Sequence, residues 1–294
     1  APTSAMPTDP NTQLHQRRLA DALAELQPAL PDAATMEPQS NRLAFTDPEF
    51  LLRRETRGIR FQLELLKPDL GQAAQGIENT VVVYGSARFV AADEAAALLA
   101  AAQASGDAAA VALAERAVRN SRYYEQARAF AGMVAQHSNA QELANRLYVC
   151  TGGGPGIMEA ANRGAQEAGA LTVGLNIALP HEQGNNRFIT PTLNYQFHYF
   201  ALRKMHFMMR AKALVAFPGG FGTLDELFEV LTLVQTGKAK PVPIVLFGTE
   251  FWRRLLDFQT LVDVGTISEA DLELFHITDD PQDAWNRIKA FYQL

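Results

Sequence analysis

The chain has 294 residues, 48% of them hydrophobic and 20% charged, with a formal net charge of −6, which is the balance of an ordinary globular protein. A net negative charge disfavours a large surface for nucleic acid or anionic membranes, and no apolar run reaches the roughly 18 residues of a membrane span. Cys150 is the single cysteine, so an internal disulfide is excluded, and no cysteine–histidine cluster indicates a metal site. The first residues lack a basic segment followed by an apolar core, so we expect a cytoplasmic protein.

The N-terminal part of the chain differs in composition from the rest. Residues 1–45 are rich in proline, alanine and polar residues, and we expect a partly disordered arm there. A capping residue precedes Pro48, a pattern typical of a helix start, and the following apolar stripe predicts a helix that ends before Pro68. This helix would occupy the segment 46–76 as an N-terminal helical extension of the main domain.

From residue 77 to residue 294, short β-branched runs alternate with helical stretches. The runs are continuously apolar, and each main helical stretch has ten residues or more. Buried strands alternating with helices predict an α/β domain, with a parallel sheet covered by helices on both faces. The alanine-rich segment 91–117 predicts a helix pair divided near residues 105–107. The predicted strands are 80–85, 146–150, 172–177, 213–217 and 243–247, and the predicted helices that follow are 156–169, 200–211 and 222–235.

Three of these strands run into turns of small residues. The turns are GSAR at 85–88, TGGGPG at 151–156 and PGGFGT at 218–223. Ligands of an open parallel sheet bind beyond the carboxyl ends of the strands, where a helix start offers unpaired N–H groups to an anion. The turns therefore indicate a ligand that carries phosphate. Neither the G-x-G-x-x-G spacing nor the G-x-x-x-x-G-K-[ST] P-loop is present.

Charged residues near the last turn allow two interpretations. Thr223 and Glu226 form T-x-x-E, which at a helix start is typical of a capping box. Alternatively, because a carboxylate repels phosphate, Glu226 acts on another part of the ligand, such as a sugar. Arg203 is a charge in the otherwise apolar segment 195–209, and if buried it requires a partner, for which Glu226 and a ligand phosphate are candidates. The methionines of that segment fit core packing.

The motif P-G-G-x-G-T-x-x-E at 218–226, the pair Arg203 and Lys204, and the glycines at 152–154 resemble the lonely-guy (LOG) family. Its members are cytokinin riboside 5′-monophosphate phosphoribohydrolases and bacterial relatives that act on AMP. The resemblance covers about residues 77–250. It implies a Rossmann-like, doubly wound fold, usually dimeric, that hydrolyses the N-glycosidic bond of a nucleoside 5′-monophosphate to free base and ribose 5-phosphate.

The resemblance also implies residue roles. Arg203 and Glu226 take the catalytic positions, and no cofactor is implied. The family has often carried the label lysine decarboxylase, but that chemistry requires pyridoxal phosphate on a lysine, and only Lys204 is placed for it. Thr232 is either a ligand contact or a satisfied helix threonine. The residues expected around the substrate and its phosphate are Glu182, Lys204, Gly219, Gly220, Gly222, Thr223, Asp225, Thr232, Gly153, Gly154 and Ser86.

Cleavage of a ribosyl–base bond passes through a sugar with oxocarbenium character, which a nearby carboxylate stabilises. Glu226 is placed to do this and to orient or deprotonate water, while Arg203 either fixes the substrate or stabilises the departing base. A non-catalytic nucleotide sensor or carrier on the same fold is the alternative. A third interpretation makes the N-terminal helices an interaction module that the site regulates.

The chain departs from the short plant enzymes of the family. The first 75 residues and the helical insertion near 91–140 are absent from them. This difference makes AMP at least as strong a candidate substrate as a nucleotide with an isopentenylated base. The amphipathic helix at 47–66 and the Met- and Phe-rich helix at 200–211 carry more apolar surface than one sheet face needs. We therefore expect a homodimer or a larger homo-oligomer.

Overall fold

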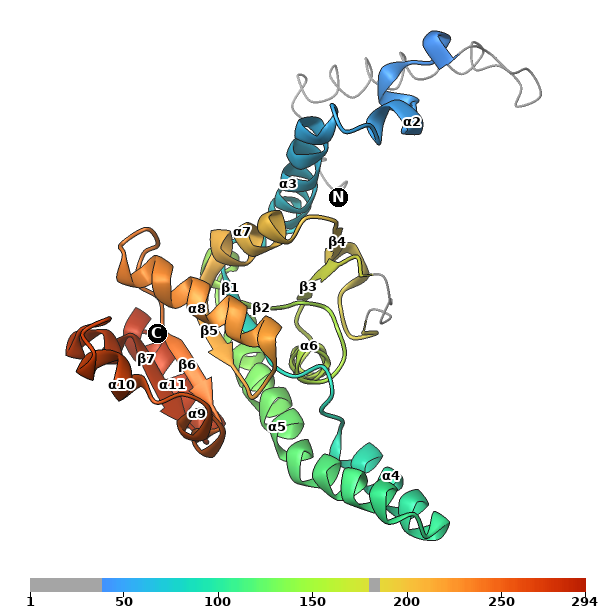
Figure 1. Ribbon diagram of the computed structural model, residues 1–294. Coiled ribbons are helices and arrows are strands. Elements are labelled where there is room, and N and C mark those ends of the chain that lie inside the picture. The colour runs from blue at the N-terminus through green and yellow to red at the C-terminus, as the bar shows by residue number, and fades with distance from the viewer. Residues whose placement is uncertain (1–38, 180–185) are drawn as a thin grey trace, which may run out of the picture. The chain divides into compact units, whose positions relative to one another are not determined.

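The computed structural model describes residues 39–179 and 186–294 (Figure 1), and the chain forms two compact units, Ala1–Arg60 and Phe61–Leu294. Most of the expected N-terminal arm lies outside the described residues, and so does Glu182. Two short 3-10 helices, Gln39–Asn41 and Ala44–Thr46, begin the described part.

The predicted helix start at Pro48 is confirmed. Helix α2 (Pro48–Leu51) has Pro48 in its first turn, and the Asp47 carboxylate accepts the N–H groups of Glu49 and Phe50 at 3.0 and 3.1 Å. Such a cap satisfies donors that the helix itself leaves unpaired. The chain then leaves the helix after one turn, so one continuous helix from this start is wrong.

A second helix, α3 (Arg57–Ala74), runs through Pro68, so the predicted end before that proline is also wrong. Proline removes one backbone hydrogen bond from a helix interior. Contacts beyond the proline hold the last turns: the Arg210 guanidinium pairs with the Asp69 carboxylate at 2.7 Å, and the Gln72 amide donates to the Pro68 carbonyl at 3.2 Å. Tertiary contacts therefore override the local stop signal.

The centre of the larger unit is a seven-stranded parallel sheet with the order β4-β3-β2-β1-β5-β6-β7. All five predicted strands are confirmed, with ends shifted by at most two residues, and the two strands at the edges, β4 and β7, were not predicted. The strands are β1 (Thr80–Tyr84), β2 (Tyr148–Thr151), β3 (Thr172–Ile177), β4 (Asn194–Phe197), β5 (Ala211–Ala216), β6 (Ile244–Phe247) and β7 (Phe275–Thr278).

Helices connect the strands, and the predicted helix pair is confirmed. Gly106, with φ of 69°, ends α4, and Asp107 caps α5 by accepting the Ala109 N–H at 2.9 Å. The helices are α4 (Ala92–Ser105), α5 (Ala108–Asn139), α6 (Ile157–Glu167), α7 (Phe200–Arg210), α8 (Phe221–Gln235), α9 (Thr249–Leu255), α10 (Phe258–Asp263) and α11 (Pro281–Tyr292), with 3-10 turns at Leu143–Asn145, Pro191–Leu193 and Glu269–Leu274.

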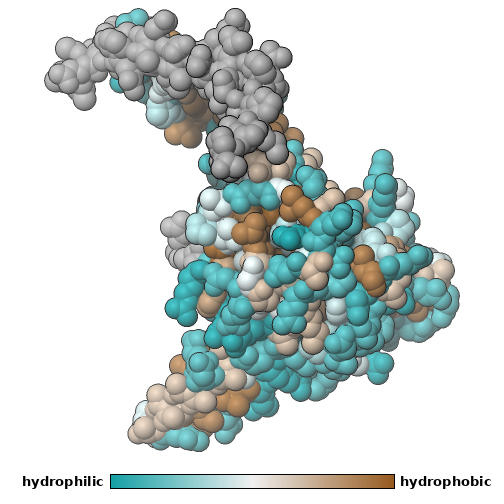
Figure 2. Space-filling view, turned by 180° about the vertical axis from the view of Figure 1, so that it is seen from behind, coloured by the Kyte–Doolittle hydropathy of each residue, from teal (hydrophilic) through white to brown (hydrophobic). Residues whose placement is uncertain are grey.

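The helix pair α4–α5 carries apolar side chains on its surface. In Figure 2 apolar surface gathers toward the end of this hairpin, and Leu98 of α4 and Leu113 of α5 are exposed. No helix within residues 39–179 and 186–294 is long and apolar enough to cross a membrane.

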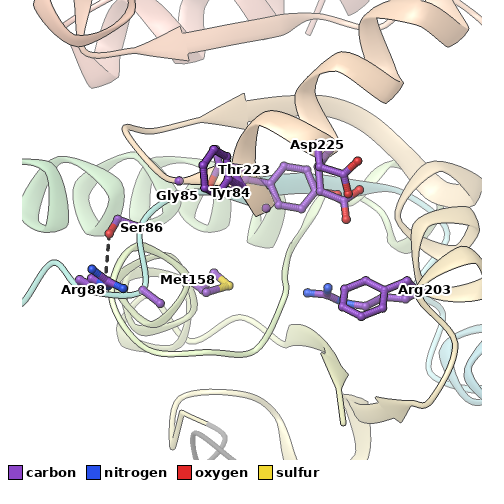
Figure 3. A pocket seen from close by; sticks show the side chains of 14 residues that line it. Tyr84, Gly85, Ser86, Arg88, Met158, Arg203, Thr223 and Asp225 are labelled. Carbon is purple, nitrogen blue, oxygen red and sulfur yellow. Dashed lines mark hydrogen bonds between the residues drawn. The ribbon is translucent and has the colours of Figure 1, made fainter. Parts of the chain in front are cut away.

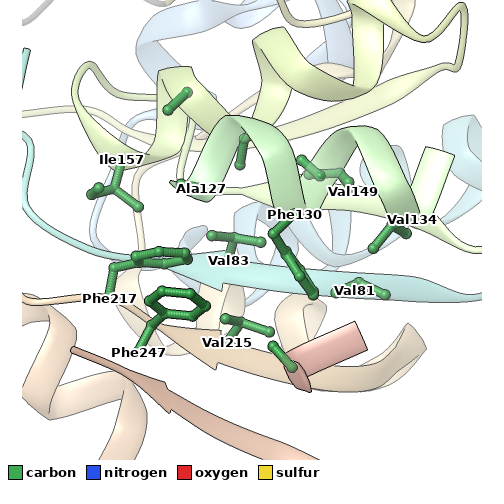
Figure 4. Packing of buried hydrophobic residues seen from close by; sticks show 14 of the residues in the cluster. Val81, Val83, Ala127, Phe130, Val134, Val149, Ile157, Val215, Phe217 and Phe247 are labelled. Atoms are coloured by element: carbon green, nitrogen blue, oxygen red, sulfur yellow. The ribbon is translucent and has the colours of Figure 1, made fainter. Parts of the chain in front are cut away.

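Both faces of the sheet are covered, which confirms the doubly wound, Rossmann-like α/β fold. Helices α5, α6 and α11 pack on one face, and α7 and α8 pack on the other. In Figure 4 Phe217 and Phe247 stack with 4.5 Å between ring centroids, beside Val83 and Val215 of the sheet and near Phe130 of α5. Burial of such side chains is the main favourable contribution to folding.

The strand order places the region where a ligand should bind. The chain winds from β1 outward to β4 and then returns to add β5, β6 and β7 on the other side of β1. The switch point therefore lies between β1 and β5, and crevices at the carboxyl ends of such strands bind ligands in doubly wound folds. Two of the glycine-rich turns, those after β1 and β5, meet there.

Candidate functional site

A cavity of about 610 Å³ opens at this switch point (Figure 3). Its walls are the end of β1 and the loop after it (residues 84–88), the first two turns of α8 with its N-cap Gly220, Met158 of α6, and Phe200 and Arg203 of α7. In Figure 3 Arg88 and Arg203 lie on opposite sides of Met158, so the cavity has a cation at each end.

The start of α8 shows that the capping-box interpretation is wrong. Gly220 is the N-cap, no side chain caps the helix, and the first helical residue is Phe221. Thr223 is therefore the third residue of the helix and Glu226 the sixth, too far along for their side chains to cap its start. The first-turn N–H groups receive no side-chain cap, which leaves the positive end of the helix facing the cavity.

Glu226 is a buried carboxyl group in the cavity wall, with 7% of the residue exposed. Burial raises its pKa to about 7, and the neighbouring carboxylates of Glu229 and Asp225 act in the same direction, while Lys204 and Arg203 oppose them. A carboxyl group with a pKa near 7 exchanges protons readily at neutral pH, which is the property of a general acid or base.

Arg203 is held at the cavity by the backbone of β3. Its Nε donates to the Leu175 carbonyl at 2.7 Å, and its guanidinium lies 5.1 Å from the centre of the Phe207 ring. Gly152 makes this position possible, because a β-carbon there would meet the guanidinium. Among the described residues Arg203 forms no ion pair, so the partnership with Glu226 that the sequence suggested is not formed. Its Nη atoms remain available to a ligand.

Lys204, the neighbour of Arg203, turns toward α8. Its ammonium lies 2.7 Å from a Glu229 carboxylate oxygen, 2.9 Å from Asp225 and 3.8 Å from Glu226. Lys204 is absent from the cavity lining among the described residues. Lys204 therefore contacts the carboxylates of α8, whereas the family resemblance implied that it contacts the substrate.

The structure brings most of the expected residues together. Ser86 lies at one end of the cavity near Arg88, whose backbone N–H it accepts at 3.1 Å. Gly219 lies just outside the lining, packed against the Thr223 side chain. The expected residues that line the cavity are Ser86, Arg203, Gly220, Gly222, Thr223, Asp225 and Glu226.

Three other expected residues lie outside the cavity lining. Gly153 packs against Asn176, and Gly154 packs against Met158. These two glycines lie behind the residues that line the cavity and allow close packing there. Thr232 donates its hydroxyl to the Phe228 carbonyl at 2.7 Å, the usual arrangement of a satisfied helix threonine.

Several lining residues were not predicted. Arg88 ends the GSAR turn, and its position directly after a strand was the available signal. Phe200 and Phe221 are large exposed aromatic residues at the cavity, with exposed fractions of 51% and 92%. Tyr84 is buried, and its hydroxyl has no hydrogen-bond partner among the described residues. No local pattern distinguishes Tyr84 from any other strand residue.

The chain is similar to known proteins in sequence and in structure. The family model described as "possible lysine decarboxylase" matches residues 158–288, which include Arg203 and the whole of α8. Two solved structures are similar at low identity. They are a molybdenum cofactor binding protein from Rippkaea orientalis (16% identity, 73% of this chain and 98% of that chain, TM-score 0.45) and a Moco carrier protein from Chlamydomonas reinhardtii (21%, 74% and 99%, TM-score 0.43).

Curated relatives carry a more specific name. The chain is 32% identical over 145 residues to cytokinin riboside 5′-monophosphate phosphoribohydrolase LOG2 of Arabidopsis thaliana, which covers 45% of this chain and 65% of the relative. It is 27% identical over 132 residues to a probable enzyme of the same name, LOG4, from Oryza sativa subsp. japonica, covering 44% and 56%. The chain thus matches about three fifths of the length of these relatives. With the motif at 218–226, these matches confirm the resemblance of the chain to the lonely-guy family.

Proposed function

We propose that this protein hydrolyses the N-glycosidic bond of nucleoside 5′-monophosphates, AMP among them, and releases the free base and ribose 5-phosphate. The observation that carries the proposal is Glu226, a buried carboxyl group in the cavity wall that takes no part in capping its helix. Its pKa of about 7 suits proton exchange at neutral pH. The names of the curated relatives support the same reaction.

The charges along the cavity orient the substrate. Ser86 and Arg88 lie at one end, together with the uncapped start of α8. This end suits the phosphate, because a guanidinium and helix N–H groups both bind anions. Asp225 lies at the other end, near Arg203, where a carboxylate would repel the phosphate but suits the sugar hydroxyls.

The glycosidic bond then lies between Glu226 and Arg203. As the bond breaks, positive charge develops on the sugar and negative charge on the base. The Glu226 carboxylate stabilises the sugar and accepts a proton from the attacking water, and the departing base takes up a proton from solvent, so that the free base is released neutral. Arg203 donates its Nε to the Leu175 carbonyl, and its Nη atoms, which have no partner among the described residues, stabilise the departing base. The reaction requires no cofactor.

Aromatic side chains suit the base. Phe200 and Phe221 line the cavity with exposed rings, and Met158 lies between the two arginines. A purine stacks on such surfaces with little demand for a specific hydrogen-bond pattern. The proposal therefore includes AMP and the isopentenylated monophosphate.

Assembly and location are part of the same proposal. Exposed apolar side chains lie on α3 at Leu63, Leu66 and Leu70, and on α7 at Met205 and Met209. A homodimer would bury apolar surface of this kind, and twofold association is the commonest form. We place the protein in the cytoplasm, where nucleoside monophosphates are abundant.

A panel of nucleoside monophosphates tests the proposed function. The protein is incubated with AMP, GMP, CMP and isopentenyladenosine monophosphate, and free bases are separated by chromatography. Release of base by the wild type, lost in Glu226→Gln and Arg203→Met, supports the proposal. Tight binding of a monophosphate without release of base would contradict hydrolysis and favour a nucleotide carrier or sensor.

A further inference from the structure

Lys204 is shared unequally among three carboxylates on one side of α8. Its ammonium contacts Glu229 at 2.7 Å and Asp225 at 2.9 Å, whereas Glu226 is 3.8 Å away. Lys204 is well covered, with 17% of its side chain exposed, and the Glu226 side chain is 9% exposed. The Lys204 ammonium thus pairs closely with the carboxylates of Glu229 and Asp225. Its contact with the buried Glu226 carboxylate is the longest of the three.

Apart from Lys204, the surroundings of Glu226 provide little stabilisation of its ionised form. Arg203, the other nearby cation, is held by a backbone carbonyl and forms no ion pair among the described residues. The Tyr84 hydroxyl has no hydrogen-bond partner in the described part of the chain. The charged and titratable groups that act on Glu226 or lie beside it are Tyr84 from β1, Arg203 and Lys204 from α7, and Asp225 and Glu229 from α8.

We propose that Glu229 is a positioning residue for Glu226, which holds the Lys204 ammonium on itself and so keeps a buried carboxyl group free to exchange a proton. This inference rests on the proposed function, because it assigns to Glu226 the proton exchange of the reaction. Glu229 lies outside the cavity lining and 34% of its side chain is exposed, so it acts through Lys204 and not by contact with the substrate.

Three carboxylates, those of Glu229, Asp225 and Glu226, compete for the Lys204 ammonium. An opposite charge within 4–6 Å of a carboxylate favours its ionised form, and closer approach does so more strongly. If Glu229 were neutral, the Lys204 ammonium would be drawn to the remaining carboxylates, and Glu226 would ionise at lower pH. Asp225 cannot serve as the test, because it lines the cavity and its replacement would also disturb the substrate.

The test is a titration of Glu226 in Glu229→Gln. The carboxyl group is followed by its carbon-13 chemical shift in protein labelled at glutamate, and Glu226→Gln assigns the signal. The wild type should titrate near 7, and Glu229→Gln about one pH unit lower. Glu229→Asp, which keeps the charge, should restore most of the wild-type midpoint. Glu273→Gln, an exposed carboxylate removed elsewhere, should leave it unchanged.

A purely structural ion pair between α7 and α8 gives a different result. Glu229→Gln would then lower the melting temperature and leave the midpoint of Glu226 where it is, which would overturn the inference. If Glu229→Gln does not fold, Lys204→Gln provides the test: removal of the cation should raise the midpoint above that of the wild type, and an unchanged midpoint would overturn the inference.

The titration is independent of turnover. The midpoint shift is measured without substrate, so its result does not depend on whether AMP is cleaved. If AMP is cleaved, the pH at which turnover changes should move down by the same one unit in Glu229→Gln. A shifted titration without any turnover would contradict the proposed function and leave the effect of Glu229 on Glu226 established.

Discussion

Replacing Glu226 with glutamine is expected to make the protein more stable and to stop its reaction. Burial raises the pKa of Glu226 from 4.5 to about 7, a difference of about 2.5 units. At about 1.4 kcal/mol per unit, the ionised carboxylate costs the folded state about 3 kcal/mol. Glutamine has nearly the same shape and carries no charge, so it avoids this cost.

The pH dependence follows from the sign of the shift. Because the pKa is higher in the folded than in the unfolded state, the folded protein binds the proton more tightly. The wild type therefore loses stability as pH rises from about 4.5 to about 7. Glu226→Gln should match the wild type near pH 4 and exceed it by up to about 3 kcal/mol near pH 8, a rise of several degrees in melting temperature.

Thermal melts at the two pH values and release of adenine from AMP test this prediction. Turnover should fall by about 10²–10⁴-fold, the range for a positioned acid or base. A role of Glu226 in capping the helix would instead give a less stable variant with normal turnover. A variant less stable than the wild type near pH 8, or one with wild-type turnover, would refute the assignment of Glu226.

Three further predictions concern the site and the assembly. AMP should be cleaved at least about 100-fold better than adenosine, measured as kcat/KM, because the phosphate anchors the sugar during bond cleavage. Gly152→Ala should lower kcat by at least about 10-fold, because the new methyl group meets the Arg203 guanidinium. Gly58→Ala, where an added methyl group meets nothing within 4 Å, is its control, and circular dichroism checks that both fold. Light scattering at micromolar concentration should give the mass of a dimer or larger species, and a monomer mass would contradict the proposed assembly.

The central strands could be predicted because their sequences reflect burial on both faces. Runs such as Val81–Val83 and Ile244–Phe247 are continuously apolar, as expected for interior strands of a parallel sheet. The edge strands β4 and β7 carry mixed sequences, NYQF and FHIT, because an edge strand needs less apolar cover. Their polar residues left no strand signal. The passage of α3 through Pro68 depends on contacts with residues far along the chain.

The candidate site was predicted less completely than the fold. The motif at 218–226 identified Glu226, but its T-x-x-E spacing also allowed a capping box between Thr223 and Glu226. The helix begins earlier, at Phe221 after Gly220, and this displacement separates Glu226 from the cap. The direction of Lys204 could not be predicted either, because adjacent helix residues such as Arg203 and Lys204 point about 100° apart. Only the packing of α7 against α8 decides which of the two faces the cavity.

The central claim is that the protein breaks the bond between ribose and base. The direct measurement is the product stoichiometry from AMP, with adenine, ribose 5-phosphate, adenosine and inorganic phosphate quantified in one reaction. We predict adenine and ribose 5-phosphate in equal amounts, with neither adenosine nor inorganic phosphate formed. Adenosine with inorganic phosphate, or AMP recovered intact from protein that binds it, would contradict the claim.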